Sequence, residues 1–234
     1  LGFIQFAQTT AYFPLKLVQI MGRVTFPLYS RLQDDPKAFA ETLGRSIQIC
    51  AFATFFFVGL FLGMGRQVIH VIFTDKWLPA LPLLYIYASV ISIGFISPVA
   101  AAALDASGRP QIIAKLAFGW TLLNWAVVLL TTPRWGMVGF AAGYSVHVVV
   151  GNVAVLILML YLIPGVRVMR RLAVPMVGGV VVFGFGRRVG PYAMDVPSFI
   201  AAVVVCFLIF ALFLPFVRRD GSPDAPPRAP RPRA

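Results

Sequence analysis

The chain has 234 residues, of which 59% are hydrophobic and only 12% are charged, and its formal net charge at pH 7 is +12. A soluble globular domain carries about 25% charged residues, so this composition excludes an ordinary soluble protein and predicts an integral membrane protein. The basic residues are dispersed among the ends of apolar segments, which argues against nucleic-acid binding.

Apolar runs and helix breakers divide the chain into seven predicted helices, so we expect an all-α integral membrane protein. A membrane span needs about 20 mostly apolar residues. The sixth segment is the weakest by this measure, because its uncharged run covers only residues 172–186; it spans with snorkelling arginines at its ends or is re-entrant. The link 65–79 is expected at the membrane interface. The predicted helices are 1–30, 40–64, 78–105, 110–131, 136–163, 170–187 and 196–217.

A line of polar side chains follows one face of the first predicted helix. The spacings are 4, 3, 4, 3 and 4 residues, which at about 100° per residue places all six side chains within an arc of about 80°. Such groups are costly at membrane depth unless they face water, a ligand or other helices. We therefore predict a polar cavity for an anionic cargo; the alternative is a polar seam buried against a missing half of the protein. This polar stripe consists of Gln5, Thr9, Tyr12, Lys16, Gln19 and Arg23.

The distribution of basic residues predicts the orientation, because cytoplasmic loops carry an excess of Lys and Arg. With the loops on alternate sides, thirteen basic residues share a side with the C-terminus: Arg31, Lys37, Arg45, Arg109, Lys115, Arg167, Arg170, Arg171, Arg218, Arg219, Arg228, Arg231 and Arg233. The opposite side has five: Arg66, Lys76, Arg134, Arg187 and Arg188. We therefore expect a cytoplasmic C-terminus.

Both ends of the chain carry further signals. The first residue is Leu1, no basic segment precedes the first apolar run, and the predicted orientation starts that run outside the cell. The simplest explanation is the C-terminal part of a longer chain with an odd number of helices upstream. Residues 218–234 are rich in proline and arginine without an apolar run, so we expect a disordered cytoplasmic tail whose arginines touch lipid head groups at most.

Residues that would support enzymatic chemistry are sparse. Cys50 and Cys206 lie inside apolar helices and predict buried packing, not a disulfide framework. His70 and His147 have no second ligand at helical spacing, so no metal site or cofactor is expected. The acidic residues lie almost entirely in loops and tail, which leaves no acid–base pair in the membrane and argues against an enzyme. Residues 196–217 contain no lysine for a retinal Schiff base.

Several isolated polar residues remain within the predicted spans. They are best explained by hydrogen bonds between helices. They are Ser89, Ser92, Ser97, Asn124, Tyr144, Ser145, His147 and Asn152.

Four short motifs, in order, resemble the bacterial O-antigen and exopolysaccharide flippases of the multidrug/oligosaccharidyl-lipid/polysaccharide exporter superfamily. The match covers residues 1 to about 163, while the rest agrees in hydropathy and position only. Thr74 stands where this family usually has glycine, so the turn there is expected to differ. The motifs are Leu1-Gly2-Phe3 followed by Ala7; Val24-Thr25-Phe26-Pro27-Leu28-Tyr29-Ser30-Arg31-Leu32; Val71-Ile72-Phe73-Thr74-Asp75-Lys76-Trp77; and Leu104-Asp105-Ala106-Ser107-Gly108-Arg109-Pro110.

The resemblance implies the second lobe of a two-lobe helical-bundle transporter. Residues 1–163 would be second-lobe core helices and residues 164–217 two additional C-terminal helices. The implied cargo is an isoprenoid-diphosphate-linked oligosaccharide, flipped across the bacterial inner membrane by alternating access during surface polysaccharide synthesis, with other polysaccharide-assembly proteins as possible partners. Lys16 and Arg23 would then bind the diphosphate, and Gln5, Thr9, Tyr12 and Gln19 the sugar hydroxyls.

Two other functions stay open. A drug/cation antiporter of the same superfamily would normally use an intramembrane carboxylate, which this segment lacks. A non-transporting membrane subunit that anchors polysaccharide enzymes would not need an aligned cationic stripe.

Overall fold

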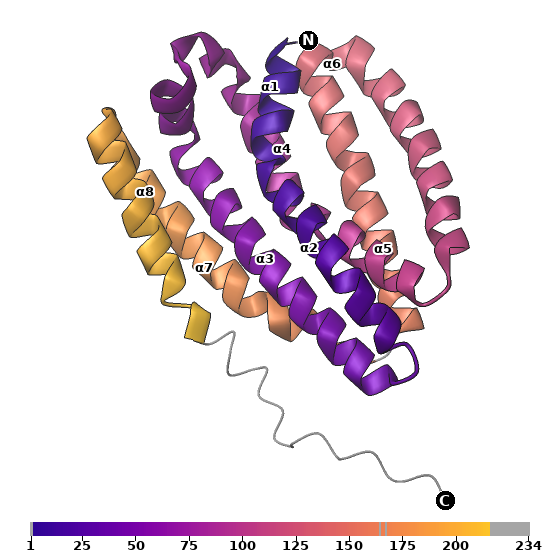
Figure 1. Ribbon diagram of the computed structural model, residues 1–234. Helices are drawn as coiled ribbons and strands as arrows, with labels where there is room; N and C mark the ends of the chain where they lie inside the picture. The colour runs from indigo at the N-terminus through magenta and orange to yellow at the C-terminus, as the bar shows by residue number, and fades with distance from the viewer. Residues whose placement is uncertain (1, 164, 167, 216–234) are drawn as a thin grey trace, which may run out of the picture.

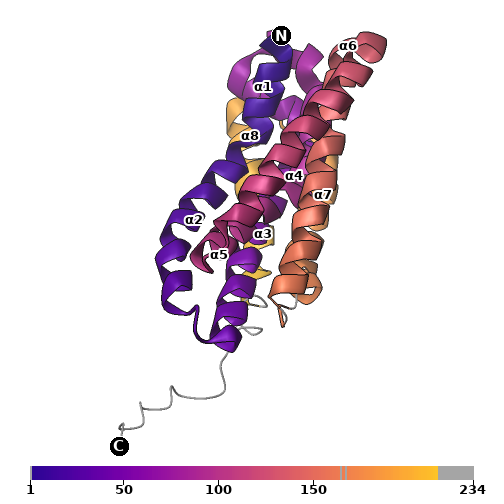
Figure 2. The same cartoon turned by 90° about the vertical axis from the view of Figure 1, so that its right-hand side faces the viewer.

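The computed structural model describes residues 2–163, 165–166 and 168–215, and within these ranges every regular element is a helix. The predicted tail, 218–234, lies outside the described residues. The helices stand side by side in one bundle, with the chain crossing from end to end (Figures 1 and 2). The protein is therefore an all-α, multi-pass membrane protein, as the composition predicts.

The first predicted helix is divided in two. Helix α1 (Gly2–Ala11) ends just before Tyr12, and α2 (Phe13–Arg31) begins just after it. Pro14 has no amide hydrogen for the carbonyl one turn earlier, which explains why the helical hydrogen-bond ladder breaks there. Neither part by itself is both long and apolar enough to count as a spanning helix, so the predicted helix 1–30 is divided at Tyr12.

Helix α3 (Pro36–Gln67) follows a tight turn and is capped at its start. Both the Lys37 and Ala38 amides donate to the Asp35 side chain over 3.1 Å, and Pro36 occupies the first helical position. These features satisfy amide groups that a helix leaves free at its start. The helix continues into a π-helical turn, η1 (Val68–Phe73), which makes one apolar element of 38 residues.

The link between the second and third predicted helices folds back onto the start of the chain. It consists of η1 and the 3₁₀ helix η2 (Asp75–Ala80), where Trp77 stacks on Phe6 with ring centroids 4.5 Å apart. Between them Thr74 has a φ of 154°, a backbone conformation that favours glycine. The turn thus keeps a glycine-like geometry although threonine stands there.

Four further helices belong to the bundle. Helices α4 (Leu81–Gly94) and α5 (Ile96–Ala106) form one apolar path that bends at Phe95, three residues before Pro98. Helix α7 (Val168–Val189) continues into η3 (Gly190–Tyr192), and α8 (Val196–Ala211) completes the described part. The weak sixth segment is thus long enough to cross, whereas α8, predicted to span easily, has only 16 helical residues.

Helix α6 (Pro110–Leu162) accounts for two of the predicted spans. Its 53 residues would measure about 80 Å if straight, more than twice the hydrocarbon core of a bilayer. Gly136 adopts φ 56° and ψ −133°, and the chain reverses there, so that two antiparallel arms result (Figure 1). With this hairpin, the described helices follow the order of the seven predicted segments.

The ends of the helices alternate between the two ends of the bundle. The turns 32–35 and 107–109 and the close of α8 lie at one end, and the start of α1, η2 and the reversal within α6 lie at the other (Figure 1). This is the alternation on which the orientation was predicted. It groups the described basic residues as the sequence analysis did.

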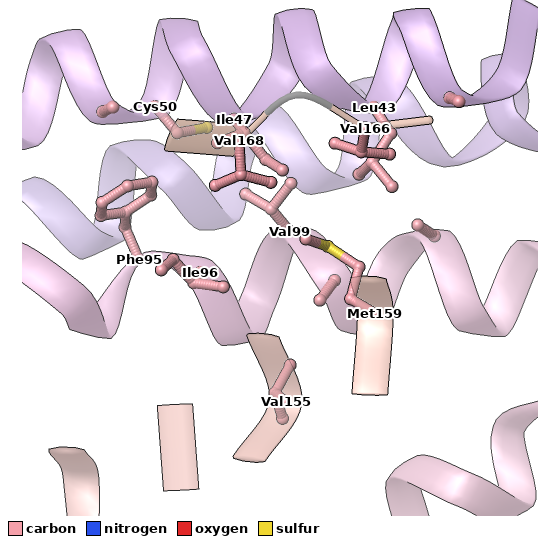
Figure 3. Packing of buried hydrophobic residues seen from close by; sticks show 14 of the residues in the cluster. Leu43, Ile47, Cys50, Phe95, Ile96, Val99, Val155, Met159, Val166 and Val168 are labelled. Carbon is pink, nitrogen blue, oxygen red and sulfur yellow. The ribbon is translucent and has the colours of Figure 1, made fainter. Parts of the chain in front are cut away.

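The apolar core is built on α3. Figure 3 shows side chains of α3, α5, α6 and the segment before α7 interlocking around one centre. The labelled members are Leu43, Ile47, Cys50, Phe95, Ile96, Val99, Val155, Met159, Val166 and Val168. Both free cysteines, Cys50 and Cys206, are buried, as predicted.

Glycines bring α3 and α7 into backbone contact. A Cβ added at Gly59 would lie 2.4 Å from the carbonyl oxygen of Gly179, and one at Gly63 would lie 2.9 Å from that of Phe183. Without a hydrophobic driving force in lipid, such close packing of small residues is what holds helices together. Helix α7 is therefore fixed to the core along its length.

We expect Gly59→Ala to destabilise the protein by about 1–3 kcal/mol, because the new methyl group meets backbone that cannot move aside. Gly184→Ala on the exposed side of α7 is the matched control, since nothing lies within 4 Å of the added Cβ. The control should be neutral or gain up to about 1 kcal/mol from alanine's helix propensity. Thermal unfolding in detergent measures both; equal melting temperatures would contradict the packing argument.

Candidate functional site

Three members of the polar stripe line one groove. Gln5 and Thr9 come from α1 and Lys16 from α2, and the Gln5 amide donates to the Thr9 hydroxyl over 3.4 Å. The groove has a volume of about 680 Å³, within the range of small-molecule binding sites. Its other walls come from α3, η1, η2 and α8.

Those walls are almost entirely apolar. Aromatic side chains dominate them, among them Phe57, Phe61, Phe73, Trp77 and Phe199. The groove thus offers a polar edge along α1 and α2 and a broad apolar surface opposite. Such a surface suits an amphipathic ligand with a polar head and a hydrocarbon portion.

Lys16 is exposed on this edge and has no ion-pair partner in the described part of the chain, where the ion pairs are Arg45–Glu41 and His70–Asp75. A charge beside low-dielectric walls attracts an opposite charge more strongly than it would in water. The chemistry of this edge therefore favours an anion.

Tyr12 lies apart from the groove. It is half-buried where α1 gives way to α2, and its ring centroid lies 6.1 Å from that of Tyr87 and 6.3 Å from that of Tyr144. It therefore packs inward against α4 and the second arm of α6. The ideal helical line drawn through the sequence does not hold across the break at this residue.

Gln19 and Arg23 extend the stripe beyond the groove. Both side chains are exposed on α2, and neither lines the groove. Arg23 lies seven residues from Lys16, or about 10 Å along a helix axis. The structure therefore brings three of the six predicted residues together and leaves two further along the same helix.

Elsewhere in the described bundle, a polar pair connects two helices, whereas Ser89, Ser92 and Ser145 donate to carbonyl oxygens of their own helices. The side-chain oxygen of Asn152 accepts hydrogen bonds from the amide and the hydroxyl of Ser97, over 3.1 and 2.7 Å, and ties α6 to α5. His147 lies 2.7 Å from the Tyr144 carbonyl oxygen and bonds within its own helix. Asn124 differs, because its buried side-chain oxygen lacks a hydrogen-bond partner among the described residues.

Sequence reasoning did not find the apolar walls of the groove. They come from four separate elements, and no local pattern distinguishes a phenylalanine that faces a groove from one that faces lipid. The described residues contain no group of three or more His, Cys, Asp or Glu side chains placed to hold a metal ion.

Comparison with known proteins adds three findings. The family described as "Polysaccharide biosynthesis protein" matches residues 1–82, about a third of the chain. A Klebsiella pneumoniae protein described as "Uncharacterized membrane protein in cps region" is 23% identical over 134 residues, which cover 57% of this chain and 27% of that protein. The solved structure of "Lipid II flippase MurJ, inward closed conformation" superposes with a TM-score of 0.71 at 16% identity.

The MurJ superposition covers 94% of this chain and 47% of that structure, so the chain spans about half the length of the protein whose fold it shares. At this identity the likeness shows the fold alone. It agrees with the sequence motifs and with the match to residues 1–82. The match to residues 1–82, the Klebsiella relative and the shared fold all agree with the resemblance to polysaccharide flippases that the sequence motifs indicate.

Proposed function

We propose that this chain is the second lobe of a flippase that moves a lipid-linked oligosaccharide across the bacterial inner membrane for surface polysaccharide synthesis. The cargo would carry its sugars on an isoprenoid diphosphate, and transport would proceed by alternating access. The observation that carries the proposal is Lys16, a cation without an ion-pair partner among the described residues, on the edge of an apolar groove.

Each part of the groove suits one part of such a cargo. The Lys16 ammonium group would attract the diphosphate, and Gln5 and Thr9 would hydrogen-bond polar groups next to it. The aromatic walls would contact the first part of the isoprenoid chain. Gln19 and Arg23 would extend the polar path along α2, while Tyr12 would support the break between α1 and α2 from inside the bundle.

The remaining parts of the chain receive supporting roles in this proposal. Residues 1–163 would form the core of the second lobe, and residues 164–217, with α7 and α8, an additional pair packed on α3. The C-terminus would lie in the cytoplasm, where 218–234 would remain a tail. The described fold of MurJ, named a lipid II flippase, supports a transporter of this architecture.

Within the full-length protein, we expect Lys16→Ala to lower polysaccharide export about tenfold and Arg23→Ala to lower it less, because only Lys16 lines the groove. Lys16→Arg should retain partial export, and Lys16→Glu should abolish it. Surface polysaccharide relative to protein level in a complementation series measures the effect. Arg188→Ala, near the C-terminal end of α7, is the control for the loss of a positive charge.

Export equal to wild type from the Lys16→Ala, Arg23→Ala double mutant would contradict an anionic cargo at this edge. A loss of export matched by an equal loss of protein would instead favour the polar-seam alternative, in which the stripe holds two lobes together.

Labelling with a membrane-impermeant thiol reagent separates a wet groove from a dry seam. In a background without Cys50 and Cys206, Thr9→Cys should react, because its side chain is exposed along the groove. Ala11→Cys, at a fully buried position, and Leu129→Cys, at an exposed apolar position facing lipid, should both stay unreactive. A Thr9→Cys variant that resists labelling in the full-length protein would support the seam.

The orientation is tested by reporter fusions. We expect the end of the bundle that holds most basic residues to face the cytoplasm. A reporter that is active only in the cytoplasm should therefore be active when it is placed after Ala234. The same reporter placed after Tyr192, at the other end of the bundle, should give the opposite result. Activity of a periplasmic reporter after Ala234 would reverse the proposed topology.

A further inference from the structure

A second groove runs between α3 and α8, on the far side of Phe57 from Lys16. It has a volume of about 830 Å³, and its walls are mostly aromatic: Phe52, Phe56 and Phe57 of α3 face Phe207 and Phe210 of α8. The rings contact one another across the groove, with centroids 4.2 Å apart for Phe52 and Phe210. The flippase proposal gives this groove no role.

One end of the groove is polar. Arg45 and Gln48 line it on the face of α3 that continues through Phe52 and Phe56. Leu214, just beyond the end of α8, lines the groove as well, so Arg45 lies level with the end of that helix. From Arg45 to Phe57 is twelve residues, or about 18 Å along α3. The groove therefore begins at a cation near a membrane surface, and the rest of its length is apolar.

Gln48 indicates what kind of ligand the polar end of the groove can bind. Its side chain is only 2% exposed, and its amide nitrogen finds no hydrogen-bond acceptor among the described residues. A buried donor left unpaired costs about 1–3 kcal/mol, so such groups usually have a partner. Because Gln48 lines the groove one turn from Arg45, a bound ligand can supply the missing acceptor.

We propose that this groove binds one anionic diacyl phospholipid of the surrounding membrane. Its phosphate contacts the Arg45 guanidinium, an ester carbonyl oxygen accepts a hydrogen bond from the Gln48 amide, and one acyl chain lies along Phe52, Phe56 and Phe57. The order of cation, donor and apolar channel matches the order of phosphate, ester and hydrocarbon in such a lipid.

The ester group distinguishes this occupant from a polyprenyl diphosphate. A polyprenyl diphosphate has no ester carbonyl oxygen, so at Gln48 it could offer only a phosphate oxygen, which the Arg45 guanidinium also attracts. Arg45 already contacts Glu41 over 3.3 Å. A guanidinium group has five N–H donors in a planar fork, so it can hold a phosphate oxygen and this carboxylate together.

Native mass spectrometry of the purified full-length protein tests the proposal with defined lipids. Wild type should retain diacyl phosphatidylglycerol, and Arg45→Gln should weaken its binding about tenfold through loss of a charge-assisted hydrogen bond. Lys37→Gln is the matched control, because Lys37 is an exposed cation on the same helix outside the groove. Glu41→Gln should strengthen binding, since it removes a negative charge that repels the lipid phosphate.

The role of Gln48 is tested with a dialkyl ether phosphatidylglycerol, which lacks the carbonyl oxygens. Wild type should prefer the diacyl lipid about fivefold, the effect of one hydrogen bond, and Gln48→Leu should bind both lipids equally. Unfolding temperatures without lipid show whether each variant folds. The proposal fails if Arg45→Gln and Lys37→Gln bind phosphatidylglycerol alike, or if wild type binds the ether lipid as well as the ester lipid. It also fails if Arg45→Gln weakens the binding of a polyprenyl diphosphate but leaves the binding of phosphatidylglycerol unchanged.

Discussion

The bilayer offers no water to polar groups, and this constraint decides both how the helices pack and where the polar side chains lie. Helices satisfy their own backbone, and breaks such as those at Tyr12 and Phe95 are covered by neighbouring helices. Polar side chains that remain must bond across the bundle, as Asn152 does with Ser97, or face a cavity, as Lys16 does.

Helix α3 takes part both in the packing of the helices and in the walls of the two grooves. Glycines on one face let α7 approach closely, which fixes the C-terminal helices to the core. Aromatic side chains on another face shape both grooves, and Phe57 lines each of them. The closely packed α3–α7 pair therefore places an apolar wall opposite the polar edge of the broken α1–α2 path.

Composition and hydropathy predicted the all-α membrane fold, because a bilayer requires long apolar segments and these are visible locally. The same reasoning treated 1–30 as one helix, whereas the structure divides it at Tyr12, two residues before Pro14. It also overrated 196–217, whose helix ends at Ala211, and underrated the sixth segment, whose glycines and flanking arginines hide a full-length helix.

The polar stripe was visible in the sequence because charged groups are rare in apolar helices. Its division was not, because the break turns Tyr12 inward against Tyr87 and Tyr144, and contacts between distant residues leave no local pattern. The groove between α3 and α8 was missed for the same reason. Arg45 reads as a loop-end cation and Gln48 as an ordinary polar residue until both are seen to line one groove.

The central claim is that Lys16 recognises the diphosphate of a lipid-linked cargo. Binding of a polyprenyl diphosphate and of the matching neutral polyprenol to the full-length protein, with wild type and Lys16→Ala compared in one detergent, tests it most directly. Wild type should prefer the diphosphate by about tenfold or more, the preference should weaken as salt is raised, and Lys16→Ala should lose most of it. Equal preference in the two proteins would contradict the account.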